Sequence, residues 1–558
     1  MSNPPSLRAK NAPRIAVLCL VAACVAYFAC DNRMRGLLAR TLWLALASNA
    51  IALPLGTVWG AAIAKIDVAG RRWLTAILGG MLLAPLALQA GAWQAACGAG
   101  GWLVQFFDGR PYSPGWLQGT WGAIWVHGMA AVPWTALFVA QALATAPGRW
   151  EEEALLDAPS WRVIWKVSLP RAVGGWGPAA LWTCVVCSSE ISVTDFFLTT
   201  AAQNTFAEEI YNVAALGGIG VAGTIGPQPA LPRSGGSLSW ESLALGCTAV
   251  AFAVWAGLLW CTERSQGLLS TWDRGRWQWL PRRRWATTSV AWSIALLAAL
   301  IPLASLVEKV GWTTGQGGGT PRSWSLLVCL ERIAASPWLQ RREWGWSLAM
   351  GAGATLLAVI VGFAAAWFTR GRRRLEWVCV AATAAVLAIP GPLWGEAVVM
   401  LFSRPADSAW SWLGWLYDRT LAAPILAQAW RAVPLATLAL WSAVRQMPDE
   451  LVEATRSDGA GAWARLRRLG VPMCRPALVA AGVLAMASSM GELSATLLTL
   501  PPGATPLSVR LFGLLHYGVD DRASAICLTM WGFCALLAMA AMKWGDVVEV
   551  RGEGRQIE

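Results

Sequence analysis

The sequence predicts an all-α polytopic membrane protein with about twelve transmembrane helices in two parallel six-helix repeats. Hydrophobic residues make up 56% of the 558 residues and charged residues only 14%, whereas soluble domains carry about 25% charged residues. The mean hydropathy is +0.48. Apolar stretches of about 20 residues, the length that spans a bilayer as a helix, recur along the chain between short charged loops. A third observation, an internal repeat, divides these stretches into two sets.

The predicted spans fall into two groups of six. In the first half we place them near 14–30, 41–64, 73–96, 119–145, 173–199 and 241–262, and in the second near 286–308, 344–368, 375–400, 421–445, 476–499 and 524–544. The first run follows three basic residues, which is also typical of a signal peptide. Since Tyr27 and Phe28 suit cleavage before Cys30 poorly, we expect an uncleaved span.

The net charge of +12 comes almost entirely from Arg. Basic residues cluster in 65–72, 263–285 and 369–374, which lie on one side together with both termini. Since positive loops stay inside, that side is the cytoplasm. The residues Arg33, Arg35 and Arg40, beside the first external turn, run against this rule. Because the basic residues lie between apolar spans rather than on one soluble face, the partner that they indicate is the lipid bilayer and not nucleic acid.

The two halves are related in sequence. Val132-Pro133 recurs as Val433-Pro434, 301 residues later, and Pro170 recurs as Pro472 at an offset of 302. We therefore predict a first unit at 1–262, a basic cytoplasmic linker at 263–285 and a second unit at 286–558. An even number of spans in each unit makes the repeats parallel, so both copies of any loop face the same side. The Gly-rich segments 217–237 and 311–325 are expected to be external loops.

The best-preserved repeat unit is the cytoplasmic loop after the fourth span of each half, at 147–170 and 448–472. Pro448 suits the start of a helix, and the acidic residues after it favour the helix N-terminus. Gly459 suits a left-handed stop, and Pro472 is expected to break a second short helix. Each loop is therefore predicted to form a helix–turn–helix at the membrane surface.

These loops resemble the EAA motif of binding-protein-dependent ABC importer permeases, which runs E-A-A-x-x-x-G, a gap, then I-x-L-P. The second copy matches at Glu453, Ala454, Asp458, Gly459 and Pro472, and the first at Glu152, Ala154, Asp157 and Pro170. The first copy lacks the Gly, and Pro159 can make its turn instead. The resemblance implies that both loops are coupling helices that dock on an ATPase subunit. Two units fused in one chain are most similar to iron(III) and thiamine importer permeases, and this favours ferric iron as substrate.

Two carboxylates are predicted within the fifth spans. Glu190 and Glu492 lie 20 residues beyond Pro170 and Pro472. A carboxylate at the centre of a bilayer costs about 2.5–3.5 kcal/mol on insertion scales, and such groups usually face the bundle interior or a water-filled path. We expect both to face the interface between the halves, near a gate on the translocation path. A structural hydrogen bond between helices is the alternative.

Several chemistries have no support in the sequence. It contains no Gly-Lys pair and therefore no P-loop, so ATP hydrolysis is expected on a separate chain and this chain is not expected to be an enzyme. No catalytic residues, no metal site and no bound cofactor are expected. Cys184 and Cys187 form a CxxC within a predicted span, where we interpret them as small hydrophobic residues.

Two functions fit these features. The first is the permease of an ABC importer in a bacterial inner membrane, with a cytoplasmic ATPase dimer and a periplasmic substrate-binding protein that docks on external loops such as 97–118 and 309–343. The second is a secondary transporter driven by an ion gradient, since parallel six-span repeats suit that class as well. Glu190 and Glu492 would then bind the coupling ion, but the repeated loops would have no role.

Overall fold

The computed structural model describes residues 8–66, 68–108, 115–144, 148–198, 203–215, 240–266, 284–312, 323–404, 407–516 and 521–554. These residues are almost entirely helical, and the β-structure within them is an isolated bridge between Trp312 and Trp324. The predicted all-α fold is therefore confirmed. Up to the linker, the helices are α1 (Arg8–Ala29), α2 (Asn32–Ala64), α3 (Arg71–Leu82), α4 (Leu86–Cys97), α5 (Trp102–Asp108), α6 (Gly119–Ala144), α7 (Gly148–Asp157), α8 (Ser160–Val163), η1 (Ile164–Ser168), α9 (Leu169–Ser189), α10 (Ser192–Leu198), α11 (Phe206–Ala215) and α12 (Trp240–Gln266).

The second half has a similar series of helices. They are α13 (Arg284–Ala295), η4 (Leu296–Leu300), α14 (Ile301–Val310), α15 (Leu326–Leu339), α16 (Arg341–Thr369), α17 (Arg373–Ala388), α18 (Gly391–Phe402), α19 (Ser411–Arg419), α20 (Ala422–Gln446), α21 (Asp449–Ser457), α22 (Ala462–Arg465), η5 (Leu466–Gly470), α23 (Val471–Met473), α24 (Arg475–Gly491), α25 (Thr496–Thr499), α26 (Leu507–His516) and α27 (Asp521–Gly554). The η segments are single π-helical turns within longer helices.

The number of membrane spans depends on how bent helices are counted. Among the described residues, 7 helices are long and apolar enough to cross a membrane, and 11 spans result if each of four bent helix pairs counts as one. Every predicted span coincides with one of these except 14–30. There the structure has α1, whose described apolar part, Ala16–Ala29, is shorter than the others. The chain is thus a multi-pass membrane protein. The 11 spans would become the expected twelve if α1 were counted as well.

Four spans that we predicted as continuous helices are broken. The pair α3 and α4 bends by 107°, and the pair α17 and α18 bends by 99°. Pro85 and Pro390 stand at these two breaks, immediately before α4 and α18. Proline donates no backbone hydrogen bond and keeps the residue before it out of helical conformation. The helix therefore ends before each proline and restarts in a new direction at the equivalent place in each half.

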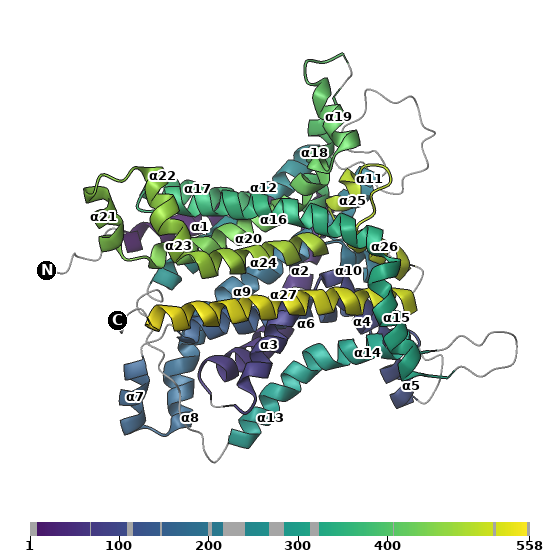
Figure 1. Cartoon of the computed structure of the whole chain (residues 1–558), viewed down its shortest axis with the longest axis horizontal. Coiled ribbons are helices and arrows are strands. Elements are labelled where there is room, and N and C mark those ends of the chain that lie inside the picture. The colour runs from purple at the N-terminus through teal and green to yellow at the C-terminus, as the bar shows by residue number, and fades with distance from the viewer. Residues whose placement is uncertain are drawn as a thin grey trace, which may run out of the picture.

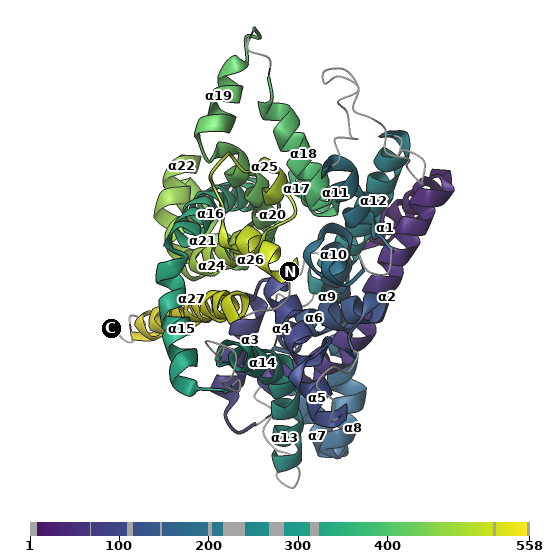
Figure 2. The ribbon, with the colours of Figure 1, turned by 90° about the vertical axis from the view of Figure 1, so that its right-hand side faces the viewer.

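The helix packing repeats from one half to the other. Helix α2 packs on α6 as α16 packs on α20, and α9 packs on α6 as α24 packs on α20. Figure 2 shows α2, α6 and α9 as one cluster and α16, α20 and α24 as another, on opposite sides of the molecule. The contacts between halves are also paired, because α12 lies on α17 and α27 lies on α3.

The predicted linker and the two Gly-rich loops lie largely outside the described residues. Of 263–285, α12 reaches Gln266 and α13 begins at Arg284, so the proposed unit boundaries stay a prediction. The segment 217–237 is entirely outside, and 311–325 is mostly so. The predicted external loop 309–343 contains a helix, α15, that packs against α27.

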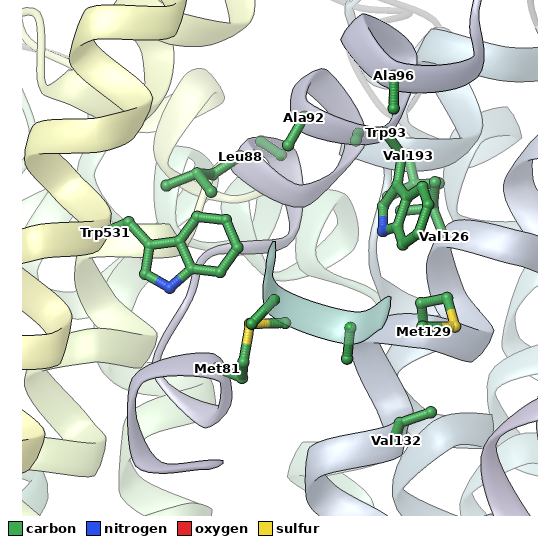
Figure 3. Packing of buried hydrophobic residues seen from close by; sticks show 14 of the residues in the cluster. Met81, Leu88, Ala92, Trp93, Ala96, Val126, Met129, Val132, Val193 and Trp531 are labelled. Atoms are coloured by element: carbon green, nitrogen blue, oxygen red, sulfur yellow. The ribbon is translucent and has the colours of Figure 1, made fainter. Parts of the chain in front are cut away.

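The largest hydrophobic cluster joins the two halves. It includes Trp93 of α4 and Met129 of α6 together with Trp531 of α27, all almost fully buried. Figure 3 shows Trp531 beside Leu88 and Met81, across from the residues of α6. Because residues of α3, α4 and α6 share one core with α14 and α27, the halves are held together by side-chain packing and not only by the chain connection.

The three external Arg residues that oppose the charge rule are used within the protein. Arg33 forms an ion pair with Glu209 of α11, and Arg40 donates to the carbonyl of Asn204 at 3.3 Å. Beside this contact, burial raises the pKa of Glu208 to about 7, so this carboxyl is partly protonated at neutral pH. Arg33 and Arg40, near the N-terminal end of α2, thus hold α11 and the residues just before it against α2. These two charges therefore have a structural role.

Small residues allow α2 and α6 to approach closely. A Cβ atom on Gly60 would lie 2.5 Å from the carbonyl oxygen of Ala136, and one on Gly56 would lie 2.4 Å from the Cβ atom of Thr135. Helices in membranes associate mainly through such close packing, because lipid supplies no hydrophobic drive between them. Glycine at these two positions therefore sets the distance between α2 and α6.

We predict that Gly60→Ala lowers the thermal stability of the purified protein in detergent, because the new methyl group meets backbone rather than a movable side chain. Gly532→Ala is the matched control, since its Cβ would meet no heavy atom within 4 Å. The loss of monodisperse protein with temperature, followed by fluorescence-detected size exclusion, measures both. Equal midpoints for the two variants would refute the role of Gly60 in packing.

Candidate functional site

Each of the two repeated loops folds as a helix–turn–helix. In the first half α7 is followed by α8, and in the second half α21 is followed by α22. Figure 1 shows α7 and α8 at the same end of the molecule as α21 and α22, and the C-terminal end of α27 lies at this end too. The second helices begin at equivalent residues, Ser160 and Ala462, each after a residue in extended conformation. The predicted shape of both loops is confirmed.

The turns between the helices differ as their sequences require. Gly459 has φ of 75°, the left-handed conformation that glycine adopts without strain. In the first copy the amide of Ala158 donates to the carbonyl of Ala154, and Pro159 in extended conformation then leads into α8. Two residues separate α7 from α8, whereas four separate α21 from α22, and the shorter turn contains no glycine. The missing Gly therefore shortens the turn and leaves the helix–turn–helix intact.

The predicted break at Pro472 is present, one residue beyond the proline, whereas the equivalent Pro170 lies within a continuous helix. Residues 160–189 run as one helix through Pro170, and in the second half the bend of 79° comes after Pro472, between Met473 and Arg475. A π-helical turn precedes each proline, η1 in the first copy and η5 in the second. A wider turn changes the hydrogen-bond register from i−4 to i−5. The register shift accommodates a residue that has no N–H and would otherwise clash with the preceding turn.

The residues predicted to dock the ATPase lie mostly on the surface. Seven are exposed and two are half-buried; the exposed ones are Glu152, Asp157, Pro170, Glu453, Ala454, Asp458 and Gly459, and the half-buried ones are Ala154 and Pro472. Trp161 and Trp463, which the sequence analysis did not single out, are 52% and 71% exposed at equivalent positions of α8 and α22. Each loop thus presents an acidic first helix and a tryptophan on its second.

Each first helix is fastened by a cation at the end of the second span, a contact that the sequence did not reveal. In the first copy Lys65 Nζ donates to Glu151 Oε2 at 3.0 Å, and Ser168 Oγ donates to Glu151 Oε1 at 3.1 Å. In the second copy Arg370 donates to Asp449 at 2.8 Å and to the carbonyl of Met447 at 2.6 Å.

These two anchors differ in burial. Lys65 and Glu151 are 5% and 4% exposed, whereas Asp449 is 88% exposed. Lys65 directly follows α2 and Arg370 directly follows α16. Because α2 packs on α6 as α16 packs on α20, the two cations occupy equivalent positions in the two halves. Helix α7 is therefore held by a buried ion pair, and α21 by a pair whose carboxylate is exposed.

The two intramembrane carboxylates stand at equivalent breaks. Glu190 directly follows α9, and Glu492 directly follows α24. Glu190 Oε1 accepts from the amide of Ser192 at 3.1 Å, and Glu492 accepts from the amides of Ala495 and Thr496 at 2.8 and 2.9 Å. Each carboxylate therefore accepts from amides that the break removes from the helical ladder. These bonds are local caps and not the bond between separate helices that we gave as the alternative.

Glu190 also bridges the two halves. Arg431 of α20 donates through Nη1 to Glu190 Oε2 at 3.1 Å and through Nη2 to Ser189 Oγ at 2.6 Å. The guanidinium lies 4.9 Å from the ring centre of Trp430. Arg431 was not among the predicted site residues. Its sequence position could have indicated it, because it is a charge ten residues inside the apolar run 421–445 and aligns with Ala130 of the first half.

A cavity of about 100 Å³ lies beside this ion pair, between the halves. Its walls come from the α3–α4 break, from α6 and α9 in the first half, and from α20 and α24 in the second. Trp134 and Trp182 form one wall, with ring centres 4.8 Å apart. Among the described lining residues, Glu190 and Arg431 are the charged ones.

The described residues thus form two matching helical halves with a cavity between them and a pair of helix–turn–helix loops at one end. Comparison with known proteins identifies the class of the second half. Residues 358–545 match the family of binding-protein-dependent transport system inner membrane components. This part of the chain, in the second half, therefore belongs to the inner-membrane permeases of the ABC importer class. Permeases of this class are not themselves enzymes, and they act with a separate ATPase and a substrate-binding protein.

Three relatives show the range of this class. The chain is 26% identical over 264 residues to the 2-aminoethylphosphonate transport system permease protein PhnV of Salmonella typhimurium, covering 47% of this chain and 94% of PhnV. It is 26% identical to the putrescine transport system permease protein PotI of Escherichia coli, over 35% of this chain and 69% of PotI. It is 25% identical to the trehalose/maltose transport system permease protein MalF of Thermococcus litoralis, over 23% of this chain and 44% of MalF.

We predict that Glu151→Gln destabilises the protein on the order of 3 kcal/mol, because it removes the carboxylate that neutralises buried Lys65. Asp449→Asn is the matched change in the other half. There the pair is exposed, and we expect a loss under about 1 kcal/mol. Thermal unfolding of the purified protein in detergent compares the two. A loss as small for Glu151→Gln as for Asp449→Asn would show that the buried pair does not anchor α7.

Proposed function

We propose that this single chain supplies both halves of the translocation path of an ABC importer, with one ATPase subunit docked on α7–α8 and another on α21–α22. The observation that carries the proposal is the pair of matching helix–turn–helix loops at one end of the molecule. Exposed Glu152 and Glu453 occupy the same position of α7 and α21. A single relative aligned over nearly its whole length covers less than half of this chain, which leaves room for two such units.

The two loops suit a dimeric partner. A pair of ATPase subunits that closes and opens on ATP would move α7 and α21 relative to each other. The ion pairs of Lys65 with Glu151 and of Arg370 with Asp449 would pass that motion to the ends of α2 and α16. Because α2 packs on α6 and α16 packs on α20, each half would then rock as a unit about the cavity between them. Such a change requires the ATPase to bind the two states with different affinity.

The proposal fixes an orientation. The end with α7, α21 and the end of α27 faces the cytoplasm, together with both termini and the basic segments 65–72, 263–285 and 369–374. The opposite end, with α5 and α15, receives substrate from the periplasmic binding protein. Glu190 and Glu492 both belong to the proposed gate, Glu190 as a charge beside the cavity and Glu492 as the cap of α24, which lines that cavity. The chain is proposed to carry no cofactor of its own.

The substrate is not defined by the relatives. Their names refer to a phosphonate, a polyamine and sugars, and none refers to iron. The expectation of ferric iron rests only on the fusion of two permease units and gains no support from these names. It therefore stands as one member of a panel to be tested.

The docking loops are tested by purifying the tagged chain from its own membranes in mild detergent. We predict that an ATPase subunit with a P-loop copurifies, and that Glu453→Arg or Glu152→Arg removes it, because either change reverses a charge on an exposed docking face. Glu331→Arg, on the exposed surface of α15 at the other end, is the control and should retain the partner. Retention of the ATPase by both docking variants would reject the assignment of the loops.

The energy source is tested by uptake into vesicles. We predict accumulation of one solute among 2-aminoethylphosphonate, putrescine, trehalose and ferric citrate that requires ATP and persists when ion gradients are dissipated by ionophores. The contrary result, uptake that collapses with the ion gradient and needs no ATP, would establish the secondary transporter. Glu190 and Arg431 would then be candidates for ion coupling.

A further inference from the structure

The cavity between the halves has an unusual charge composition for a membrane interior. It is mostly apolar, with the paired rings of Trp134 and Trp182 on one side. One carboxylate and one guanidinium line it, Glu190 from the first half and Arg431 from the second, and they contact each other. Charges inside a membrane are costly and usually mark a substrate or ion pathway.

Arg431 retains hydrogen-bonding capacity. Its two terminal nitrogens donate to Glu190 and to Ser189, while its Nε, buried, has no hydrogen-bond partner among the described residues. The side chain of Arg431 is 11% exposed and that of Glu190 is 4% exposed. Beside them the indole nitrogen of Trp430 and the hydroxyl of Ser494 are likewise buried without a partner. Buried donors without partners are rare in native proteins, and each calls for an explanation.

We propose that the importer carries a small zwitterion, a solute with a protonated amine and an acid group, that separates Glu190 from Arg431 and pairs with both. This inference rests on the proposed function and names the substrate class of its path. The amine would donate to Glu190, and the acid group would accept from Arg431 Nη and the free Nε.

The physical reason is conservation of charge in a low-dielectric site. Breaking a buried ion pair by removing one partner leaves an uncompensated charge, and this is strongly unfavourable. A zwitterion supplies a partner of opposite charge to each group as it separates them, so neither Glu190 nor Arg431 is left unpaired at any stage. A dication such as putrescine, a ferric ion or an anion would satisfy one group and leave the other unpaired. A neutral sugar would leave both without a charged partner.

Glu492 does not change this balance. It lies within electrostatic range of Arg431 and Glu190, but two backbone amides and the hydroxyl of Thr496 donate to its side chain. With its oxygens occupied and turned to its own helix end, it is a structural cap, whereas Glu190 is held across the interface by a partner that a ligand can replace. The repeat is therefore asymmetric at this point, because Arg431 aligns with Ala130.

The test measures binding to the permease itself, without the binding protein. The purified complex of chain and ATPase is heated with 2-aminoethanesulfonate, or with the two compounds that carry half of its charges, ethylamine and ethanesulfonate. A bound ligand raises the unfolding midpoint. We expect the zwitterion to act at a concentration on the order of tenfold lower than either half, equivalent to about 1.4 kcal/mol.

Single-charge variants give a result that a purely structural ion pair would not. Glu190→Gln leaves the guanidinium alone, so the preference should move to ethanesulfonate. Arg431→Gln leaves the carboxylate alone and should move the preference to ethylamine. The double variant E190Q/R431Q removes both charges without leaving either unpaired, and it should lose the response to all three compounds while still copurifying with the ATPase.

The outcomes separate this inference from the proposed function. If the ATPase copurifies but the wild-type complex responds to no zwitterion, or responds as strongly to ethylamine or ethanesulfonate, the substrate class is wrong and the importer stands. A response that persists in the double variant would also overturn it. If no ATPase copurifies with the wild-type chain, the proposed function itself fails.

Discussion

Within the membrane, every backbone amide and carbonyl of this molecule must find a partner without help from water, because the bilayer supplies none. This constraint makes the described residues almost entirely helical, and it also explains where the helices break. The four bent pairs are tolerated only where protein replaces the missing partners. At one of these breaks the replacement is a carboxylate, Glu190 after α9, and Glu492 caps the chain in the same way where α24 ends. The charges that are most costly in lipid are thus located where the backbone most needs an acceptor.

The breaks also create the functional geometry. Because α3 turns into α4 at Pro85, and because α9 ends at Glu190, these elements leave space at the interface rather than filling it with continuous helix. The cavity of about 100 Å³ lies against these breaks. Tryptophan rings and an ion pair between the halves line this cavity. The same feature that interrupts the helices therefore provides a site between two bodies that can move.

The two halves resemble each other more closely in how their helices pack than in which charged groups they carry. Helix pairs, prolines, π turns and cations at the ends of α2 and α16 recur in both halves. The details that bear on function differ: the Lys65–Glu151 pair is buried and the Arg370–Asp449 pair is exposed, and Arg431 aligns with an alanine. A symmetric scaffold suits a partner that docks twice, whereas a solute that crosses one central path meets both halves at once and needs only one copy of each charge.

The sequence by itself determined the class of fold, eleven of the spans and the two helix–turn–helix loops. Each of these depends on residues that are close in the chain: an apolar run that favours lipid, a glycine that permits positive φ at 459, and acidic residues at a helix start. The repeat offset then placed both loops on one side by parity alone. The same local signals failed for the breaks inside spans, since Pro85 and Pro390 lie in runs that remain apolar on both sides.

Only the tertiary structure decided which distant residues meet. The partners of Glu151, Glu190 and Asp449 come from other helices, and Arg431 lies 241 residues from Glu190 in the chain. No periodicity encodes such a pairing, because it depends on how bent helices from two halves face each other. Local sequence sets what a segment can become, whereas the pairing of charges in a dry interior is a property of the packed assembly.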